Sequence, residues 1–464
     1  MRSVLLIYPH FKPRRKRSSF LFPPLGLGYV ASSLREAGHR VDLLDCTFLE
    51  RDEARRRAIA SRAEVVGIYS MIFMRDDALG FARLLRDRTE LLVAGGPEPS
   101  SDPASFLDVF DIAVIGEGEE TILEVLKSLE EGTDLEAVKG IAYRRDMNWG
   151  SIGDPQQGNK NLRDPEDEVV TTEQRPHLQD LNRIPFPARD LFANDDYIRY
   201  WKSHFGRAST AVITTRGCPF ACEFCSRPVF GISYRERSAE NVLDEVEVAL
   251  DLGYDHIHFA DDVFTLHRDR VLDICQGIRD RRLSFRWECL GRVDSIDPTV
   301  ASAMRGAGCE RVLFGIESGS DPILKLMKKR ITAREAQRAI SAARSAGLKT
   351  GAFFILCYPG ETDDTVIETI RFATRLPLDY LSFTTPHPLP GTVLYERVRE
   401  KIDFLDPPMD GGAIFDGEFS KRKMRFAKLK GDLQFGVRRR LGRGAPLVLS
   451  PFEAVTDGIL RLMK

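Results

Sequence analysis

The sequence contains no apolar run of about 18 residues or more, so it predicts no helix that crosses a membrane. It also lacks an excess of either charge, because 67 Lys and Arg stand against 69 Asp and Glu, for a formal net charge of −2. That balance argues against a protein whose main role is to coat nucleic acid. The N-terminal apolar segment, Val4 to Ile7, is too short for a secretory signal, and we expect a cytoplasmic protein.

Two phosphate-binding motifs are also missing. No G-x-G-x-x-G follows the first apolar segment, and G-x-x-x-x-G-K-[ST] does not occur, so neither a dinucleotide site nor a P-loop is expected. The composition that remains is that of a globular protein, with 464 residues, 43% hydrophobic and 29% charged. At roughly 150 residues a domain, two or three domains are expected.

Residues 1–132 alternate short apolar runs with helical patterns, which predicts a doubly wound, Rossmann-like α/β domain with a parallel sheet. The predicted strands are Val4–Ile7, Val41–Leu44, Val65–Tyr69, Leu91–Ala94 and Ile112–Ile115. Such sheets bind ligands at the carboxyl ends of their strands. Those ends carry Tyr8-Pro9-His10, Tyr69-Ser70-Met71, Gly95-Gly96-Pro97 and Gly116-Glu117-Gly118-Glu119.

The pattern dissolves over residues 133–207, which we interpret as a linker with one small hairpin, Ile141–Tyr143 against Val169-Val170. Over residues 208–396 six strand–helix units follow one another and predict a partial, TIM-like (βα)6 barrel. Its predicted strands are Ala211–Thr215, His256–Ala260, Phe285–Leu290, Arg311–Ile316, Thr350–Leu356 and Tyr380–Thr384. Residues 397–464 are expected to form a small helical region that shapes the substrate site. Its basic run, Arg438 to Arg440 with Arg443, is either a solvated helix end or an anion site.

Three of the eight cysteines, Cys218, Cys222 and Cys225, lie together in a loop that leaves the first barrel strand. The spacing Cys-x3-Cys-x2-Cys allows three thiolates to hold three irons of a [4Fe–4S] cluster and leaves the fourth iron open. A structural zinc site normally needs a fourth ligand, and the next histidines, His256 and His258, lie far downstream on a strand. Three unrelated buried cysteines would fit poorly with a loop rich in Gly and Pro.

The cysteine loop and the barrel pattern resemble the radical S-adenosylmethionine (radical SAM) superfamily. The preceding domain resembles the cobalamin-binding domain of one branch, and the motifs that carry this resemblance extend to about residue 396. They are Pro23 to Leu27, Arg35 to His39, Gly95 to Pro97, Gly116 to Glu119, Asp180 to Asp190, Phe314 to Gly319 and Pro359 to Thr362. The resemblance implies three cofactors: a [4Fe–4S] cluster, SAM and cobalamin.

Position by position, the resemblance assigns the cluster to Cys218, Cys222 and Cys225, which also makes them the catalytic residues. The SAM-binding candidates, at the carboxyl ends of the barrel strands, are Asp261, Asp262, Arg292, Glu317, Ser318, Tyr358 and Gly360. The cobalamin-binding candidates are Tyr69, Ser70, Met71, Gly95, Gly96, Glu117 and Gly118. Several have a second interpretation. The two aspartates are also suited to cap a strand end, Arg292 can pair with Asp294, and Ser318 can belong to an ordinary turn.

Many cobalamin proteins carry Asp-x-His-x-x-Gly after the first strand, whose histidine binds cobalt from below. This sequence reads Tyr8-Pro9-His10-Phe11-Lys12-Pro13 there, without the motif and without an aspartate in the loop that would orient His10. We therefore expect the lower face of cobalt to meet a non-ligating residue, such as Tyr69 or Met71, or water.

The resemblance implies a cobalamin-dependent radical SAM enzyme. We expect a methyltransferase that acts on an unactivated carbon through a 5′-deoxyadenosyl radical and methylcobalamin. The expected partners are a small-molecule or lipid substrate and an electron donor such as flavodoxin or ferredoxin, with no nucleic acid. A cyclase or other bond-forming enzyme of the same branch, with a tetrapyrrole, hopanoid or lipid substrate, is the first alternative. The others are an N-terminal domain that only docks a partner and a corrinoid carrier with an inactive barrel.

Overall fold

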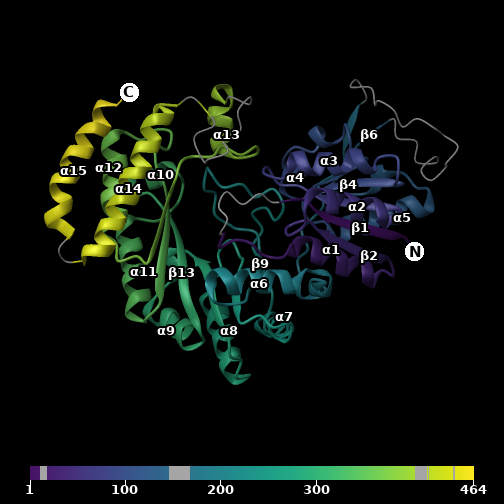
Figure 1. The fold of residues 1–464 in the computed structure, drawn as a ribbon, viewed down its shortest axis with the longest axis horizontal. Coiled ribbons are helices and arrows are strands. Elements are labelled where there is room, and N and C mark those ends of the chain that lie inside the picture. Colours follow the sequence, from purple (N-terminus) through teal and green to yellow (C-terminus); the bar gives the residue numbers. More distant parts are fainter. Residues whose placement is uncertain (11–17, 146–167, 403–414, 416, 443–444, 464) are drawn as a thin grey trace.

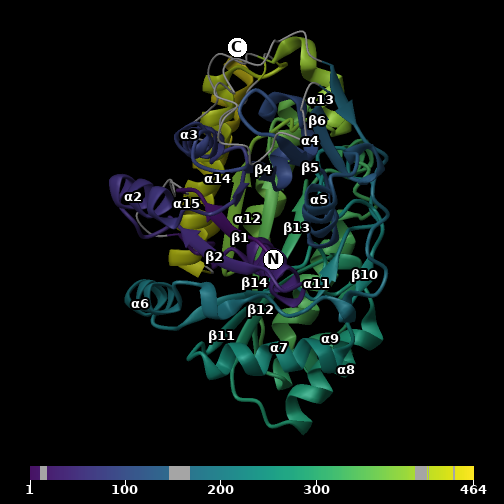
Figure 2. The same ribbon diagram turned by 90° about the vertical axis from the view of Figure 1, so that its right-hand side faces the viewer.

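The computed structural model describes residues 1–10, 18–145, 168–402, 415, 417–442 and 445–463 (Figure 1). An N-terminal α/β domain lies beside an open α/β barrel, and a pair of long C-terminal helices packs on the barrel's far side (Figures 1 and 2). Within the described residues, the structure contains no helix with the length and apolarity needed to span a bilayer.

The N-terminal sheet has seven strands in the order β2-β1-β3-β4-β5-β6-β7. They are β1 (Ser3–Tyr8), β2 (Arg40–Asp45), β3 (Val65–Tyr69), β4 (Leu91–Gly95), β5 (Ile112–Val114), β6 (Ile141–Arg144) and β7 (Val169–Thr171). The first five run parallel, as the unbroken apolar runs predict, and β6 and β7 are antiparallel. The predicted hairpin therefore forms, but it extends the main sheet through β5–β6 pairing instead of standing apart.

Both faces of this sheet are covered by helices, so the doubly wound α/β fold is confirmed. The helices are α1 (Leu25–Glu36), α2 (Arg51–Ser61), α3 (Arg75–Leu85), α4 (Pro97–Ser101) and α5 (Glu119–Glu131). One core forms under α1 and α5, and a second under α2 and α3. All the predicted cobalamin-binding residues lie at the carboxyl ends of β3, β4 and β5, which share one edge of the sheet.

The barrel sheet has six parallel strands in the order β15-β14-β13-β12-β11-β8, open between its two outer strands. They are β8 (Ser209–Val212), β11 (His256–Phe259), β12 (Arg286–Gly291), β13 (Cys309–Glu317), β14 (Lys349–Ile355) and β15 (Tyr380–Thr384). The outer ring consists of α7 (Ala239–Asp251), α8 (Arg268–Asp280), α9 (Pro298–Gly306), α10 (Asp321–Leu326), α11 (Ala333–Ser345) and α12 (Asp363–Arg375). The predicted partial barrel is confirmed.

Successive residues of the barrel strands point alternately toward the helices and into the barrel. On β11, Ile257 and Phe259 belong to the large core shared with the helices, whereas His258 pairs with Glu288 of β12 at 3.3 Å. The alternation leaves polar groups at the barrel's inner face and at the strand ends, where the site lies.

Two regions differ from the sequence prediction. The segment expected to lack regular structure contains α6 (Asn194–Phe205), which buries Tyr197 and Trp201. Only two residues of this helix are buried, both of them aromatic, so the spacing of apolar residues in the sequence did not reveal it.

In the C-terminal region α13 (Val393–Val398) precedes α14 (Lys421–Leu441) and α15 (Ala445–Leu462). Arg438 of α14 donates to Glu453 of α15 at 2.9 Å, so part of the basic run joins two helices, while Arg443 lies outside the described residues.

Candidate functional site

The three cysteines lie in a loop whose base is a two-stranded antiparallel ribbon. The ribbon strands are β9 (Thr215–Arg216) and β10 (Arg235–Glu236). Gly217 follows β9 with φ +81°, and a Cβ there would lie 2.2 Å from the carbonyl oxygen of Ser233. Only glycine allows this close backbone approach. The chain therefore turns sharply just before the first cysteine.

The loop is also held from outside by backbone hydrogen bonds to two other segments. The amide of Glu223 donates to the carbonyl of Met327 at 3.1 Å, and the amide of Leu394 donates to the carbonyl of Glu223 at 2.9 Å. Within the loop, the amide of Cys225 donates to the carbonyl of Cys222 at 3.2 Å. These contacts fix the backbone that carries the thiols.

The electrostatics of the thiols suit a bound cation. The pKa of Cys225 is raised to about 11, mainly by burial and in part by Asp262 and the other two cysteines, while Arg227 opposes them. Burial raises the pKa of Cys218 as well, with a contribution from Cys222. The three sulfurs are thus near enough to affect one another. The raised pKa values of Cys218 and Cys225 favour the protonated thiols in the absence of a metal, and iron would displace those protons on binding.

The arrangement fits a cluster better than a single ion. Within the described residues, no three His, Cys, Asp or Glu side chains converge as ligands of one metal ion. A zinc site would gather its ligand atoms around one centre at about 2.0–2.3 Å. In a [4Fe–4S] cluster each thiolate binds a different iron, so the three sulfurs are spread around a larger object. The three-cysteine spacing itself favours the cluster over the zinc alternative, which normally takes four ligands.

The two aspartates after β11 have different surroundings. Asp261 is buried and accepts hydrogen bonds from the amides of Thr214 and Thr215, at 2.6 and 2.9 Å, and from the Thr214 hydroxyl. Its carboxylate holds the start of β9, and these contacts do not favour the predicted contact with SAM. Asp262 is exposed and lies close enough to Cys218 and Cys225 to raise the pKa of both. We keep Asp262 as the SAM candidate and assign Asp261 to the strand end.

Replacing each aspartate by asparagine should separate these roles. Asp262→Asn should weaken equilibrium binding of SAM about tenfold, because a hydrogen bond to a charged group contributes about 1.5 kcal/mol or more, and should leave thermal unfolding unchanged. Asp261→Asn should lower the unfolding temperature, because an amide group would face three donors. Isothermal titration with SAM and thermal unfolding of both variants check this. The opposite pattern would reverse the assignment.

Arg292 is engaged with its neighbours. It donates to both carboxylate oxygens of Asp294 at 2.9 Å, and its guanidinium carbon lies 3.5 Å from the centre of the Phe220 ring. Arg292 thus pairs with Asp294, which was the alternative noted from the sequence. Its guanidinium also packs on Phe220 of the cysteine loop. Its role toward the SAM carboxylate stays a prediction that this pairing does not favour.

Lys329 is a site residue that the sequence did not single out. Its side chain is buried, its Nζ lies 3.3 Å from Oε1 of Glu317, and it lies 5.9 Å from the Phe224 ring of the cysteine loop. A buried ammonium between the end of β13 and the cysteine loop is suited to a carboxylate ligand. In the sequence it sits within Lys328-Lys329-Arg330, which looks like an exposed basic run.

The remaining SAM candidates differ in the hydrogen bonds and ion pairs that their side chains already make. Glu317 has φ +76°, an unusual conformation for a residue with a side chain, and its carboxylate pairs with Lys329. Ser318 is buried, bonded to the Thr369 hydroxyl at 2.9 Å, which matches the ordinary turn considered from the sequence. Among the residues that the structure describes, the buried hydroxyl of Tyr358 has no hydrogen-bond partner, as expected of a group that a ligand would complete.

The turn after β14 holds a carboxyl group that stays protonated. Gly360 has φ +94°, and its amide donates to Glu418 at 2.8 Å. Burial raises the pKa of the adjacent Glu361 to about 8, despite hydrogen bonds from the Tyr358 and Cys357 amides and Thr365. The folded state then binds more protons than the unfolded state, in which Glu361 has its ordinary pKa of 4.5. Stability is therefore lost as pH rises from about 4.5 to 8.

Glu361→Gln should remove this loss, because an amide mimics the protonated acid. The difference in unfolding free energy, variant minus wild type, should increase by up to about 1.4 kcal/mol for each pH unit between pH 5 and 8. Above pH 8 the difference should stay constant. Denaturant unfolding of the cofactor-free proteins at pH 5, 6.5, 8 and 9 measures it. An advantage independent of pH would show that Glu361 ionises normally in the fold.

The crevice at the carboxyl edge of the N-terminal sheet is built from backbone. Gly96 has φ +110°, and a Cβ there would lie 2.7 Å from the carbonyl oxygen of Ser70, whereas a Cβ on Gly95 would meet nothing within 4 Å. The space above Gly95 and the close approach at Gly96 fit the entry of a ligand's tail beside β3 and β4. The Ser70 hydroxyl itself donates to Glu98 at 2.9 Å.

The side chains near this crevice are aromatic and apolar. Tyr69 packs against Tyr8 with ring centres 5.3 Å apart, and burial raises the pKa of Tyr69 to about 12, so it stays a neutral phenol. Beyond Met71, Ile72 and Phe73 are 43% and 54% exposed, although both are large and apolar. An exposed apolar pair beside a crevice is suited to a flat hydrophobic ring. This pair could not be predicted from the sequence, because two apolar residues in a loop form no periodic pattern.

His10 has both ring nitrogens engaged. Nδ1 bonds with Asp77 of α3 at 2.8 Å, and Nε2 lies 2.9 Å from the carbonyl oxygen of Leu49. The expectation that no carboxylate would orient His10 is therefore wrong, because α3 supplies one from elsewhere in the chain. The expectation that His10 does not bind cobalt stays a prediction, and the engaged Nε2 supports it.

Glu117 and Gly118 lie at the same edge but face the barrel. The Glu117 carboxylate accepts from Arg216 at 2.9 Å and from Arg235 at 2.9 and 2.8 Å, and all three side chains are buried. Glu117 is thus engaged between the two domains, so its assignment to cobalamin stays a prediction that these contacts do not favour. The same contacts join the cobalamin-type crevice to the base of the cysteine loop.

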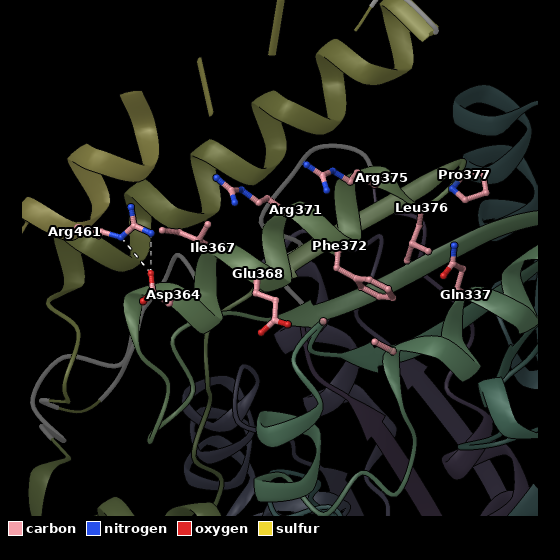
Figure 3. Close-up of a pocket in the computed structure, with 12 residues that line it drawn as sticks. Gln337, Asp364, Ile367, Glu368, Arg371, Phe372, Arg375, Leu376, Pro377 and Arg461 are labelled. Carbon is pink, nitrogen blue, oxygen red and sulfur yellow. Dashed lines mark hydrogen bonds and ion pairs between the residues drawn. The ribbon is translucent and has the colours of Figure 1, made fainter. Parts of the chain in front are cut away.

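A cleft of about 660 Å³ lies on the outer side of the barrel (Figure 3). It runs between α11 and α12, and Arg461 of α15 closes one end by pairing with Asp364 at 2.8 Å. None of the predicted site residues lines it. We therefore do not place the chemistry there.

Comparison with known proteins gives matches over both domains. The family model of the radical SAM superfamily matches residues 212–373, and that of the B12 binding domain matches residues 14–126. An uncharacterized methyltransferase of Pyrococcus horikoshii, PH0819, is 33% identical over 85% of this chain and 82% of its own length. The anaerobic magnesium-protoporphyrin IX monomethyl ester cyclase of Rubrivivax gelatinosus is 27% identical over 93% of this chain and 78% of its own.

Among solved structures, the cobalamin-dependent SAM radical enzyme OxsB, with aqua-cobalamin and SAM bound, has a similar fold. It superposes with a TM-score of 0.74 over 99% of this chain and 72% of that one, at 18% identity. At that identity the likeness establishes the fold.

Proposed function

Because this chain belongs to the radical SAM superfamily and carries a B12-binding domain before its barrel, we propose that it is a cobalamin-dependent methyltransferase acting on an unactivated carbon. The observation that carries the proposal is the contact between the two candidate cofactor sites. The carboxyl edge of the N-terminal sheet meets the base of the cysteine loop through Glu117, Arg216 and Arg235. The substrate would then lie within reach of both cofactors.

When bound, the cluster and SAM supply a carbon radical that abstracts hydrogen from the substrate, and cobalamin supplies the methyl group. The protein's part is to hold and orient. Cys218, Cys222 and Cys225 offer three thiolates on a loop whose backbone is fixed on both sides. Asp262 and Lys329 present opposite charges that suit the amino and carboxylate groups of SAM.

Because both ring nitrogens of His10 are engaged and Tyr69 stays a neutral phenol, neither residue would offer cobalt an imidazole or an anionic ligand. We propose that water or the phenol of Tyr69 faces the metal there. The apolar Ile72 and Phe73 would cover part of the ring, and the tail would enter at Gly95 and Gly96.

The experiment is product analysis after anaerobic incubation with methyl-deuterated SAM and candidate small-molecule or lipid substrates. Methyl transfer predicts a product that carries the deuterated methyl group. The similarity to the Rubrivivax cyclase favours a second candidate, ring closure or other bond formation. That reaction would give 5′-deoxyadenosine and a changed substrate without deuterium, and would contradict the methyltransferase proposal.

We also propose that an acidic one-electron donor, such as flavodoxin or ferredoxin, docks at the outer side of the cysteine loop. Buried Glu223 of the loop pairs there with Lys328, at 3.3 Å, and with Arg397. Lys325 and Arg330 are exposed on the same segment as Lys328. Such donors favour a cytoplasmic location.

Electrostatic docking predicts a dependence on salt. Formation of 5′-deoxyadenosine driven by reduced flavodoxin should fall as salt rises from about 50 to 500 mM, because exposed charges are screened. The rate with dithionite, which needs no protein surface, serves as the control and should change little. Equal salt dependence for both reductants would remove the docking surface from the account.

A further inference from the structure

The cysteine loop carries a buried arginine at each end of its base. Arg216 is the last residue of β9, Arg235 is the first of β10, and the two residues face each other in the ribbon register. Their side chains are only 4% and 3% exposed. A loop that carries cofactor ligands is thus tied at its two ends by charged groups that do not reach water.

Both arginines are neutralised by the N-terminal domain. Glu117 takes one hydrogen bond from Arg216 and two from Arg235, and its Oε2 also accepts the amide of Leu178 at 3.0 Å. Glu119 adds a second contact to Arg216 at 2.5 Å. Burial opposes ionisation of Glu117, but the two arginines outweigh it and lower the pKa of the carboxyl. The two buried carboxylates and the two buried guanidinium groups therefore form one ion-pair network in which the charges balance.

Aromatic rings extend the network on both sides. The Arg216 guanidinium lies 5.2 Å from the centre of the Tyr29 ring of α1 and 5.0 Å from that of Phe230 in the cysteine loop. One arginine therefore contacts the N-terminal domain, the loop and two carboxylates at once. A shift of either domain would separate these groups.

Such a network adds little to the stability of the fold, but it fixes the relative positions of the elements that carry it. The cost of removing four charges from water offsets most of their mutual attraction, so buried ion pairs add little to folding. A fully satisfied network, however, permits few alternative arrangements of the elements that carry it. This one joins the elements that carry the two cofactor sites.

We propose that Glu117 and Glu119 are positioning residues, which lock the base of the cysteine loop to the cobalamin-binding domain and so set the separation of cluster and cobalt. The inference rests on the proposed function, since it takes both cofactors to be present. It assigns Glu117 to the coupling of the two sites and to neither cofactor.

The first test uses the cofactor-free full-length protein and amide hydrogen exchange. Glu117→Gln, which removes the charge and keeps the size, should speed exchange in residues 217–234 by about tenfold or more. The matched control is Asp111→Asn, which breaks the buried Arg86–Asp111 pair inside the N-terminal domain. The control should leave this loop unchanged. Equal exchange in both variants would overturn the proposed lock.

If Glu117→Gln fails to fold, Arg235→Lys replaces it. Lysine keeps the charge but lacks the guanidinium nitrogens by which Arg235 also donates to the carbonyls of Ser233 and Phe230. The expected result is the same faster exchange in residues 217–234, with Asp111→Asn again as the control. Wild-type exchange in Arg235→Lys would contradict a lock that depends on this geometry.

The second test uses the loaded enzyme and pulsed electron paramagnetic resonance between cob(II)alamin and the reduced cluster. The wild type and Asp111→Asn should give one narrow distance distribution, whereas Glu117→Gln should give a broader or shifted one. An unchanged distribution would overturn the positioning role. Failure of the wild type to bind a corrinoid would refute the proposed function, while the exchange measurement would still decide whether Glu117 locks the loop.

Discussion

Replacing Cys218, Cys222 and Cys225 together by alanine is expected to abolish the iron–sulfur absorption of the reconstituted protein and the formation of 5′-deoxyadenosine. Each thiolate holds a different iron of the cluster, so the triple variant leaves no protein ligand for it. The fold should persist, because none of the three belongs to the core cluster of the barrel. Absorption after anaerobic reconstitution and chromatography of the SAM products measure the two losses.

A matched control is available in the same barrel. Cys275 is also a buried free cysteine, but it belongs to the core beneath α8 and lies outside the loop. Cys275→Ala should keep the cluster and SAM cleavage, with a modest loss of stability from one small cavity. Reductive cleavage of SAM by the triple variant would show that the cluster is held elsewhere.

The second prediction with a large expected effect concerns the axial ligand of cobalt in bound cobalamin. Cob(II)alamin bound to the protein is expected to show no splitting from an axial nitrogen, with its own base displaced and no histidine in its place. Asp77 fixes Nδ1 of His10, and the carbonyl of Leu49 lies 2.9 Å from Nε2. The nitrogen that would reach cobalt is therefore already engaged. Electron paramagnetic resonance of the cob(II)alamin state measures the splitting.

His10→Ala provides the comparison. The spectrum of this variant should match that of the wild type, although the loss of two hydrogen bonds will loosen the loop around it. Axial nitrogen splitting in the wild type that disappears in His10→Ala would identify His10 as the ligand. Asp77 would then be its orienting carboxylate, as is common for metal-bound histidines.

The regular parts of the fold could be predicted because their patterns are local. The strands Val65–Tyr69 and Tyr380–Thr384 appear with the predicted bounds, since short apolar runs mark buried strands directly in the sequence. The cysteine loop could be predicted for a different reason: three ligands within eight residues need no knowledge of the fold. By contrast, α6 was missed because its buried residues, Tyr197 and Trp201, are too few to show a period.

The side chains around the loop could not be predicted, because their roles depend on contacts far along the chain. Asp261 and Asp262 are alike in sequence, and only the positions of Thr214 and Thr215 tell them apart. Glu117 was expected at the cobalamin site, since nothing local reveals Arg216 and Arg235 about a hundred residues later. Lys329 shows the same limit, because burial separates it from its exposed neighbours.

The central claim is that one chain brings a radical source and a corrinoid methyl carrier together. The most direct measurement is mass spectrometry of the reconstituted enzyme, loaded with reduced cobalamin and incubated anaerobically with methyl-deuterated SAM and a reductant. The account predicts that the same protein sample yields both 5′-deoxyadenosine and protein-bound cobalamin with a deuterated methyl group. 5′-Deoxyadenosine from a protein that retains no corrinoid would contradict the account and leave the N-terminal domain as a docking module.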